Sequence, residues 1–169
     1  MDGTALWRTD GTSSGTYLVR DGGLGTNSKF TPRYMANVSG ILYFVANDTS
    51  TGGELWRSDG TSSGTFLVRD IFPGTSSSGT RNLTNVNGTL FFVATSPETG
   101  TEVWRSDGTS SGTNAIELVP GTGSGGGNIL NNVGAKLLYQ AILPGFGNEL
   151  FRLDGPNSTP RARLRYCSG

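Results

Sequence analysis

A Gly-Thr-Ser-Ser-Gly segment occurs three times in the chain, at residues 11–15, 60–64 and 108–112. It matches the G-x-S-x-G pattern that holds the nucleophilic serine of many hydrolases between a strand and a helix. Such a serine needs a neighbouring base, which is normally a histidine. The sequence contains no histidine, and no copy is followed by an apolar pattern of helical period. We therefore interpret the segment as a repeated turn, and we predict that the protein is not an enzyme.

A second glycine-rich segment, residues 121–126, reads G-T-G-S-G-G and matches the G-x-G-x-x-G pattern of dinucleotide-binding sites. That site needs a helix directly after the glycines, because the helix N-terminus faces the pyrophosphate. Here residues 128–133 lead into a strand-like apolar run instead. We predict a connector at this position and no nucleotide cofactor.

Asp-Gly pairs recur along the chain and could supply carboxylates to a metal ion. Calcium sites draw several oxygen ligands from closely spaced residues, as in D-x-D-x-D, whereas each of these aspartates stands alone. We predict that each Asp bonds its own turn backbone and that Gly supplies a positive φ. A calcium ion held between several loops is the alternative. The structural turn residues are then Asp10, Gly11, Asp59, Gly60, Asp107, Gly108, Asp154 and Gly155.

These motifs recur because a longer unit recurs. The ten residues W-R-S-D-G-T-S-S-G-T occupy positions 56–65 and 104–113 without a difference, and the copy at 7–16 differs only by Thr9. A degenerate copy begins at Phe151, so the units start at intervals of 49, 48 and 47 residues. A period of this length is typical of propeller blades.

Each complete unit contains four apolar runs of strand length, separated by Gly, Ser, Thr and Asn. The run at residues 41–46 is apolar throughout, which is typical of a strand buried on both faces. The pattern predicts an all-β fold, a β-propeller of four-stranded antiparallel blades of about 48 residues, with a β-solenoid as the alternative. The predicted parts are a half blade with third and fourth strands at 1–21, blades at 30–72 and 81–119, and a degenerate blade with a tail at 128–166.

One aromatic residue occupies the same place in every unit. Such a residue could be a platform for a sugar, since it combines an apolar face with a polar edge, or it could belong to the core between blades. Because the blades of a propeller bury both faces, we predict the core for all four. They are Trp7, Trp56, Trp104 and Phe151.

The charge pattern excludes several kinds of partner. Thirteen Lys and Arg balance thirteen Asp and Glu, and the sequence lacks the basic stripe expected of a nucleic-acid-binding protein. No apolar run approaches the ~18 residues of a membrane span. The residues that follow Met1 do not have the pattern of a signal peptide. The single cysteine, Cys167, can form neither an internal disulfide nor a multi-cysteine metal site.

The segments E-L-W-R-S-D-G-T at 54–61 and E-V-W-R-S-D-G-T at 102–109 resemble the ELWxxDGT repeats of large secreted or surface-attached bacterial proteins. The resemblance extends over about residues 1–155, although Ala5 replaces the glutamate in the first copy and Phe151 the tryptophan in the last. It implies a propeller-like fold outside the cell, similar to WD-repeat and kelch propellers, and no assigned chemistry. Because members of this family usually begin with a signal peptide, the resemblance also leads us to expect a fragment of a longer protein.

We expect a non-enzymatic extracellular scaffold of the adhesion type that binds proteins or surface glycans. A multivalent carbohydrate-binding lectin is the alternative, because near-identical blades would repeat a weak site. Ligands are expected on the loops that differ most between copies, at residues 47–53, 95–101 and 143–148.

The expected partners are neighbouring blades of a longer parent chain or other copies of this chain. The last unit predicts a first, a second and a worn third strand, while prolines weaken the prediction of a fourth strand at 164–166. The half blade of one copy would then complete the last blade of another and close a six-bladed homo-oligomeric ring.

Overall fold

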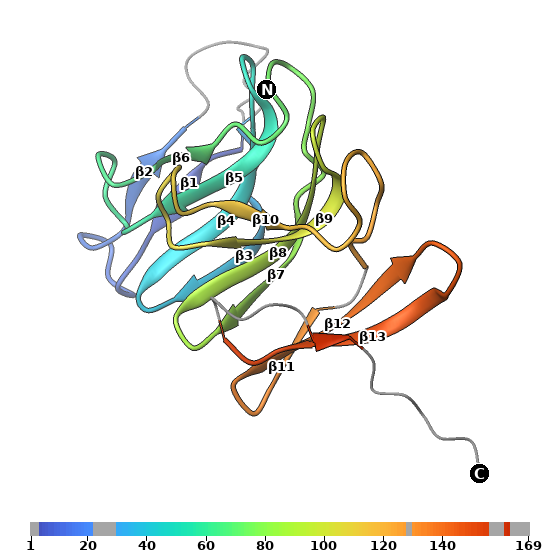
Figure 1. The fold of residues 1–169 in the computed structure, drawn as a ribbon. Helices are drawn as coiled ribbons and strands as arrows, with labels where there is room; N and C mark the ends of the chain where they lie inside the picture. The colour runs from blue at the N-terminus through green and yellow to red at the C-terminus, as the bar shows by residue number, and fades with distance from the viewer. Residues whose placement is uncertain (1–3, 22–29, 128–129, 156–160, 163–169) are drawn as a thin grey trace.

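The computed structural model describes residues 4–21, 30–127, 130–155 and 161–162 of the chain (Figure 1). This part consists of β-strands joined by turns and connectors, and it contains no helix. The prediction of an all-β, antiparallel fold is therefore confirmed. A helix long and apolar enough to cross a membrane is accordingly not found in the described residues.

The strands form four antiparallel sheets, and each sheet is built from strands that follow one another along the chain. Sheet A contains β1 (Leu6–Arg8) and β2 (Tyr17–Arg20). Sheet B contains β3 (Arg33–Val38), β4 (Ile41–Asp48), β5 (Gly52–Ser58) and β6 (Phe66–Arg69). Sheet C contains β7 (Arg81–Val86), β8 (Thr89–Ser96), β9 (Gly100–Ser106) and β10 (Asn114–Ile116). Sheet D contains β11 (Leu130–Val133), β12 (Lys136–Leu143), β13 (Gly147–Leu153) and β14 (Arg161–Ala162).

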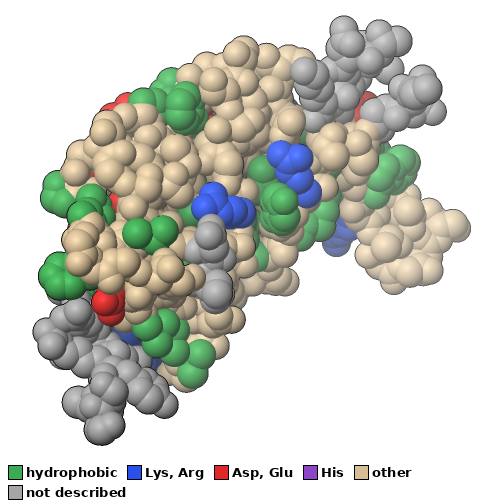
Figure 2. Space-filling view, turned by 90° about the vertical axis from the view of Figure 1, so that its right-hand side faces the viewer, with side chains coloured by type: hydrophobic (Ala, Val, Ile, Leu, Met, Phe, Trp, Pro, Cys, Tyr) green, Lys and Arg blue, Asp and Glu red, His purple; other side chains and the backbone are tan. Residues whose placement is uncertain are grey.

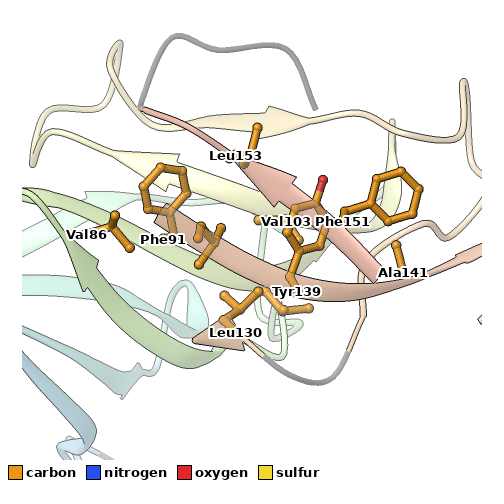
Figure 3. Close-up of a cluster of buried hydrophobic side chains, with 10 residues drawn as sticks. Val86, Phe91, Val103, Leu130, Tyr139, Ala141, Phe151 and Leu153 are labelled. Carbon is orange, nitrogen blue, oxygen red and sulfur yellow. The ribbon is translucent and has the colours of Figure 1, made fainter. Parts of the chain in front are cut away.

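Consecutive sheets pack face to face, and a separate hydrophobic cluster fills each of the three junctions. Side chains alternate between the two faces of a strand. Phe44 in β4 therefore packs toward sheet A, and its neighbour Tyr43 packs toward sheet C. In the junction between sheets C and D, Phe91 and Val103 meet Tyr139 and other residues of sheet D (Figure 3). The apolar runs of β4 and β8 are buried on both faces because each lies between two neighbouring sheets.

The first strands of sheets B, C and D lie beside one another, and asparagine side chains join them. The Nδ2 group of Asn85 donates to the carbonyl of Asn37 at 2.9 Å, and Asn132 donates in the same way to the carbonyl of Asn85. The Oδ1 atom of Asn85 also accepts from the backbone amide of Gly88 at 3.0 Å, within its own hairpin. One side chain thus fixes both a turn and the position of the neighbouring sheet.

Two-residue turns join the first and second strands of these sheets. Ser39 and Gly40 have φ values of 53° and 85°, and Asn87 and Gly88 have values of 50° and 79°. Positive φ at both central residues defines the type I′ turn, whose twist matches that of the two strands.

Sheet D corrects the expectation for the last unit. Its fourth position is filled by β14 of the same chain, where Ala162 pairs with Phe151 and Arg161 pairs with Arg152. The strand expected at residues 164–166 lies outside the described residues. A half sheet from another copy could occupy this position only by displacing β14, and the exchange between two copies stays a prediction.

Candidate functional site: repeated loops and open sheet edges

The Asp-Gly segment between β5 and β6 forms a loop that is held together by its own side chains. The Oδ1 atom of Asp59 accepts hydrogen bonds from the Thr61 hydroxyl at 2.7 Å and from the Thr61 amide at 2.8 Å. The Thr61 hydroxyl accepts from the Gly64 amide at 2.9 Å, and Thr65 donates to the Thr61 carbonyl at 2.6 Å. The same bonds recur around Asp10 and Asp107.

These hydrogen bonds favour the ionised form of the loop aspartates. The Thr61 hydroxyl and amide lower the pKa of the Asp59 carboxyl, because both stabilise its ionised form. The carboxylate also lies over Gly64, where a Cβ atom would overlap it. Gly60 has a φ of 89°, which a side chain would disfavour. Asp59 and Gly60 are thus parts of one Asx-type loop, as are Asp10 with Gly11 and Asp107 with Gly108.

The serine of the G-x-S-x-G pattern belongs to the same loop. The carbonyl of Ser62 accepts from the Thr65 amide at 3.3 Å, and the loop is closed by the buried pair Ser58 Oγ and Thr65 Oγ1 at 2.7 Å. No group of three or more His, Cys, Asp or Glu side chains that could hold a metal ion is found in the described residues. The fourth pair departs from the pattern, because Asp154 forms an ion pair with Arg152 at 2.9 Å and lies next to Gly155.

The aromatic side chain of the repeat is buried in three units and exposed to solvent in the first. Trp56, Trp104 and Phe151 lie in the clusters between sheets. Trp56 is 3% exposed, whereas Trp7 is 60% exposed. The prediction of a core position is therefore wrong for Trp7, because in the described structure no sheet packs on its face of β1.

Two arginines, which the sequence analysis did not single out, link neighbouring sheets. The Arg20 guanidinium lies 4.6 Å from the centroid of the Trp56 ring and donates to the Thr65 carbonyl at 3.2 Å. Arg69 repeats both contacts one sheet further on, at 5.6 Å from Trp104 and 2.6 Å from the Thr113 carbonyl. The signal was present in the sequence, since Leu-Val-Arg follows both of the first two copies of the loop.

Two glutamates of the repeat are fully buried, and each binds the connector that leads to the next sheet. Glu54 accepts from the amides of Ser78 at 2.8 Å and Ile71 at 3.2 Å, and Glu102 accepts from the Gly125 amide at 2.8 Å. Burial raises the pKa of each carboxyl to about 7, and the hydrogen bonds from the amides act in the opposite direction. These carboxyls therefore stabilise the connectors between sheets, and neither lies among the residues that line a described groove.

Sheets A and D lie at the two ends of the sheet stack (Figure 1), and both expose residues whose equivalents in the inner sheets are buried. Val133 in sheet D is 53% exposed, whereas Val86, at the same position in sheet C, is 2% exposed. Val133 lines a groove of about 570 Å³ together with Leu138 and Leu150. The side of the molecule that Figure 2 shows carries several separate hydrophobic patches, with only a few charged side chains between them.

A second groove of about 370 Å³ lies beside β1, between sheets A and B. The residues that line it include Trp7, Asn37, Leu42 and Gly60. This groove and the open face of sheet D both carry exposed apolar side chains, among them Trp7 and Val133.

The loops that vary between copies are tied to the next connector. The Gly53 amide donates to Ser77 Oγ at 2.8 Å, and the Gly126 amide donates to the Thr101 carbonyl at 2.7 Å. These two loops therefore bind the connectors at the B–C and C–D junctions.

No protein-family model matches the sequence, and no curated protein matches it significantly. The resemblance to ELWxxDGT repeats therefore stays a prediction that rests on the repeated segments themselves.

Proposed function

We propose that the chain is a non-enzymatic repeat scaffold of the ELWxxDGT type, built as part of a β-propeller. The observation that carries this proposal is the recurrence of one set of contacts between sheets. Arg20 and Arg69 contact the tryptophan and the loop of the following sheet, and Asn85 and Asn132 contact the preceding first strand. A junction that repeats in this way extends by adding further sheets.

The chemistry of the loops supports a structural role. The Asp59 carboxylate accepts bonds from Thr61 of its own loop, and the carbonyl of Ser62, the serine of the hydrolase pattern, accepts from the Thr65 amide. The open faces of sheets A and D support the partners that we propose, which are further sheets of the same kind in a longer chain or in other copies. By resemblance to the family, we place the protein outside the cell or on the cell surface.

A duplication of one unit tests the scaffold. We would insert a second copy of residues 33–80 between Thr80 and Arg81, and as a control a Gly/Ser linker of the same length. We expect the duplicated chain to unfold in one transition, with a larger denaturant m-value because more surface is buried. The linker variant should show no such increase. A duplication that destabilises the protein as much as the linker does would contradict the proposal.

The lectin alternative requires repeated exposed aromatic side chains. Trp56 and Trp104 are buried, but Tyr17 and Phe66 occupy equivalent exposed positions, with Arg8 and Arg57 stacked over their rings. A glycan array with sugars at millimolar concentration tests this alternative. Binding that is lost on changing both Tyr17 and Phe66 to Ala would favour a lectin.

A further inference from the structure

The first residue of the fourth strand differs between the copies of the repeat. In sheet B this residue is Phe66, which pairs across the sheet with Arg57, and the guanidinium lies 5.3 Å from the centroid of the ring. Tyr17 repeats the arrangement in sheet A. In sheet C the equivalent pair is Asn114 with Arg105. An amide thus replaces an aromatic ring at this place in the third copy.

A groove of about 410 Å³ lies beside Asn114, and this is a size at which proteins bind small ligands. Arg105 lines it, together with Asp107, Ser111 and Gly112 of the repeated loop. Sheet C has four strands, and hydrophobic clusters join its two faces to sheets B and D. The groove is therefore a feature of a complete inner sheet, independent of the open ends of the stack.

Three planar polar groups line the groove. The Asp107 carboxylate accepts on Oδ1 from the hydroxyl of Thr109 at 2.7 Å and from its amide at 2.8 Å. These two bonds lower the pKa of Asp107, so the carboxylate is ionised at neutral pH and can accept further bonds through Oδ2. The Nδ2 group of Asn114 donates to the Ser111 carbonyl at 2.9 Å, which fixes the amide. The guanidinium of Arg105 adds a group that only donates.

We propose that this groove binds a saccharide unit with vicinal hydroxyl groups. A hydroxyl both donates and accepts, so neighbouring hydroxyls can donate to the Asp107 carboxylate and to the Asn114 amide oxygen and accept from Arg105. Phosphorylated ligands fit less well, because the ionised Asp107 repels their charge. The proposal rests on the non-enzymatic scaffold proposed above and adds one ligand site to it. It differs from the lectin alternative because the site contains no aromatic ring.

An exchange of side chains between copies tests the proposal. Methyl glycosides of glucose, galactose, mannose and N-acetylglucosamine are titrated into the whole protein to ~50 mM, far above a millimolar Kd, while NMR follows the amide shifts. We expect saturable shifts at residues 105–114 with at least one glycoside. Asn114→Phe installs the ring that sheet B carries and should weaken binding at least tenfold. Phe66→Tyr, which copies sheet A, is the control and should leave binding unchanged.

A second pair of variants separates binding from the stability of the loop. Asp107→Asn keeps the oxygen that accepts from Thr109 but removes the charge, so it should weaken binding at least tenfold. Asp59→Asn makes the same change in the equivalent loop of sheet B and should leave binding unchanged. Urea unfolding of all four variants shows whether each one is folded.

Four outcomes would overturn the proposal. These are no saturation with any of the glycosides, undiminished binding by folded Asn114→Phe, equal weakening by Asp59→Asn and Asp107→Asn, and shifts that centre on Tyr17 and Phe66, which would favour the lectin alternative. The duplication experiment contains no sugar and measures unfolding alone, so a failure of the scaffold proposal is recognised separately.

Discussion

The guanidinium of Arg20 lies 4.6 Å from the centroid of the Trp56 ring, and the two residues belong to neighbouring sheets. The same side chain donates to the carbonyl of Thr65, at the end of the loop that follows the tryptophan strand. One arginine therefore joins a sheet both to the core and to the rim of the next sheet. Because Arg69 and Trp104 repeat the arrangement, it is a property of the repeat.

Replacing Arg20 should weaken the junction between sheets A and B. Arg20→Ala removes a cation–π contact and a charged hydrogen bond, for which we expect a loss of ~1–2 kcal/mol in unfolding free energy. The unfolding free energy of Arg20→Lys should lie between those of the wild type and of Arg20→Ala, because an ammonium keeps the charge but cannot stack as a plane. Urea denaturation measures both. Arg8→Ala is the control, since Arg8 is exposed and stacks on the exposed ring of Tyr17, and it should change stability by less than ~0.5 kcal/mol.

The two tryptophans Trp7 and Trp56 should differ strongly in their contribution to stability. Trp56→Ala leaves a cavity beside Phe30, whose ring lies 5.4 Å away, and should cost ~3–5 kcal/mol. Trp7→Ala removes a largely exposed side chain and should cost less than ~1 kcal/mol. Equal losses in denaturant unfolding would show that Trp7 is buried in solution.

A methyl group at Gly64 should disrupt the loop because it meets the Asp59 carboxylate. We expect Gly64→Ala to cost ~1–3 kcal/mol, the range for overpacking. Ser63→Ala, at the neighbouring exposed position, serves as the control and should cost less than ~0.5 kcal/mol. In the double variant Asp59→Ala/Gly64→Ala the clash is absent, so the combined loss should be smaller than the sum of the two single losses. Strict additivity would contradict the close contact.

The buried glutamates should make stability fall as the pH rises. Burial raises the pKa of Glu54 and of Glu102 from 4.5 to about 7. A raised pKa means that the folded state holds its proton more tightly than the unfolded state does. The stabilisation is complete below pH ~4.5 and is lost as the pH passes through 7, by up to ~3 kcal/mol for each carboxyl.

Thermal unfolding between pH 5 and 8 measures this slope. Glu54→Gln cannot titrate and should reduce the slope to the part contributed by Glu102, whereas Glu98→Gln, at an exposed loop position, should leave the slope unchanged. A stability that rises with pH in the wild type would show that the amide hydrogen bonds outweigh the burial of these carboxyls.

The repeated segments were sufficient to predict the strands and the loops, because these depend on neighbouring residues. The type I′ turn at Asn87-Gly88 and the bonds of Asp59 to its own loop are local features of this kind. Burial was not predictable in the same way. Trp7 and Trp56 have nearly identical sequence surroundings, yet only Trp56 has a sheet packed against it.

The hydrogen-bonding role of Glu54 could not be predicted from the sequence either. Its partners Ile71 and Ser78 lie 17 and 24 residues further along the chain, in a connector with no regular pattern. A glutamate beside Leu and Trp in a strand indicates burial, but the amides that satisfy it become visible only in three dimensions.

The asparagines of the first strands have a geometric consequence. Each of Asn85 and Asn132 reaches across to the strand before it with a short side chain that cannot lengthen. These side chains therefore limit the separation of successive sheets at their first strands. In the propeller that we propose, adding or removing units would then change how far the arc of sheets extends and leave its radius of curvature the same.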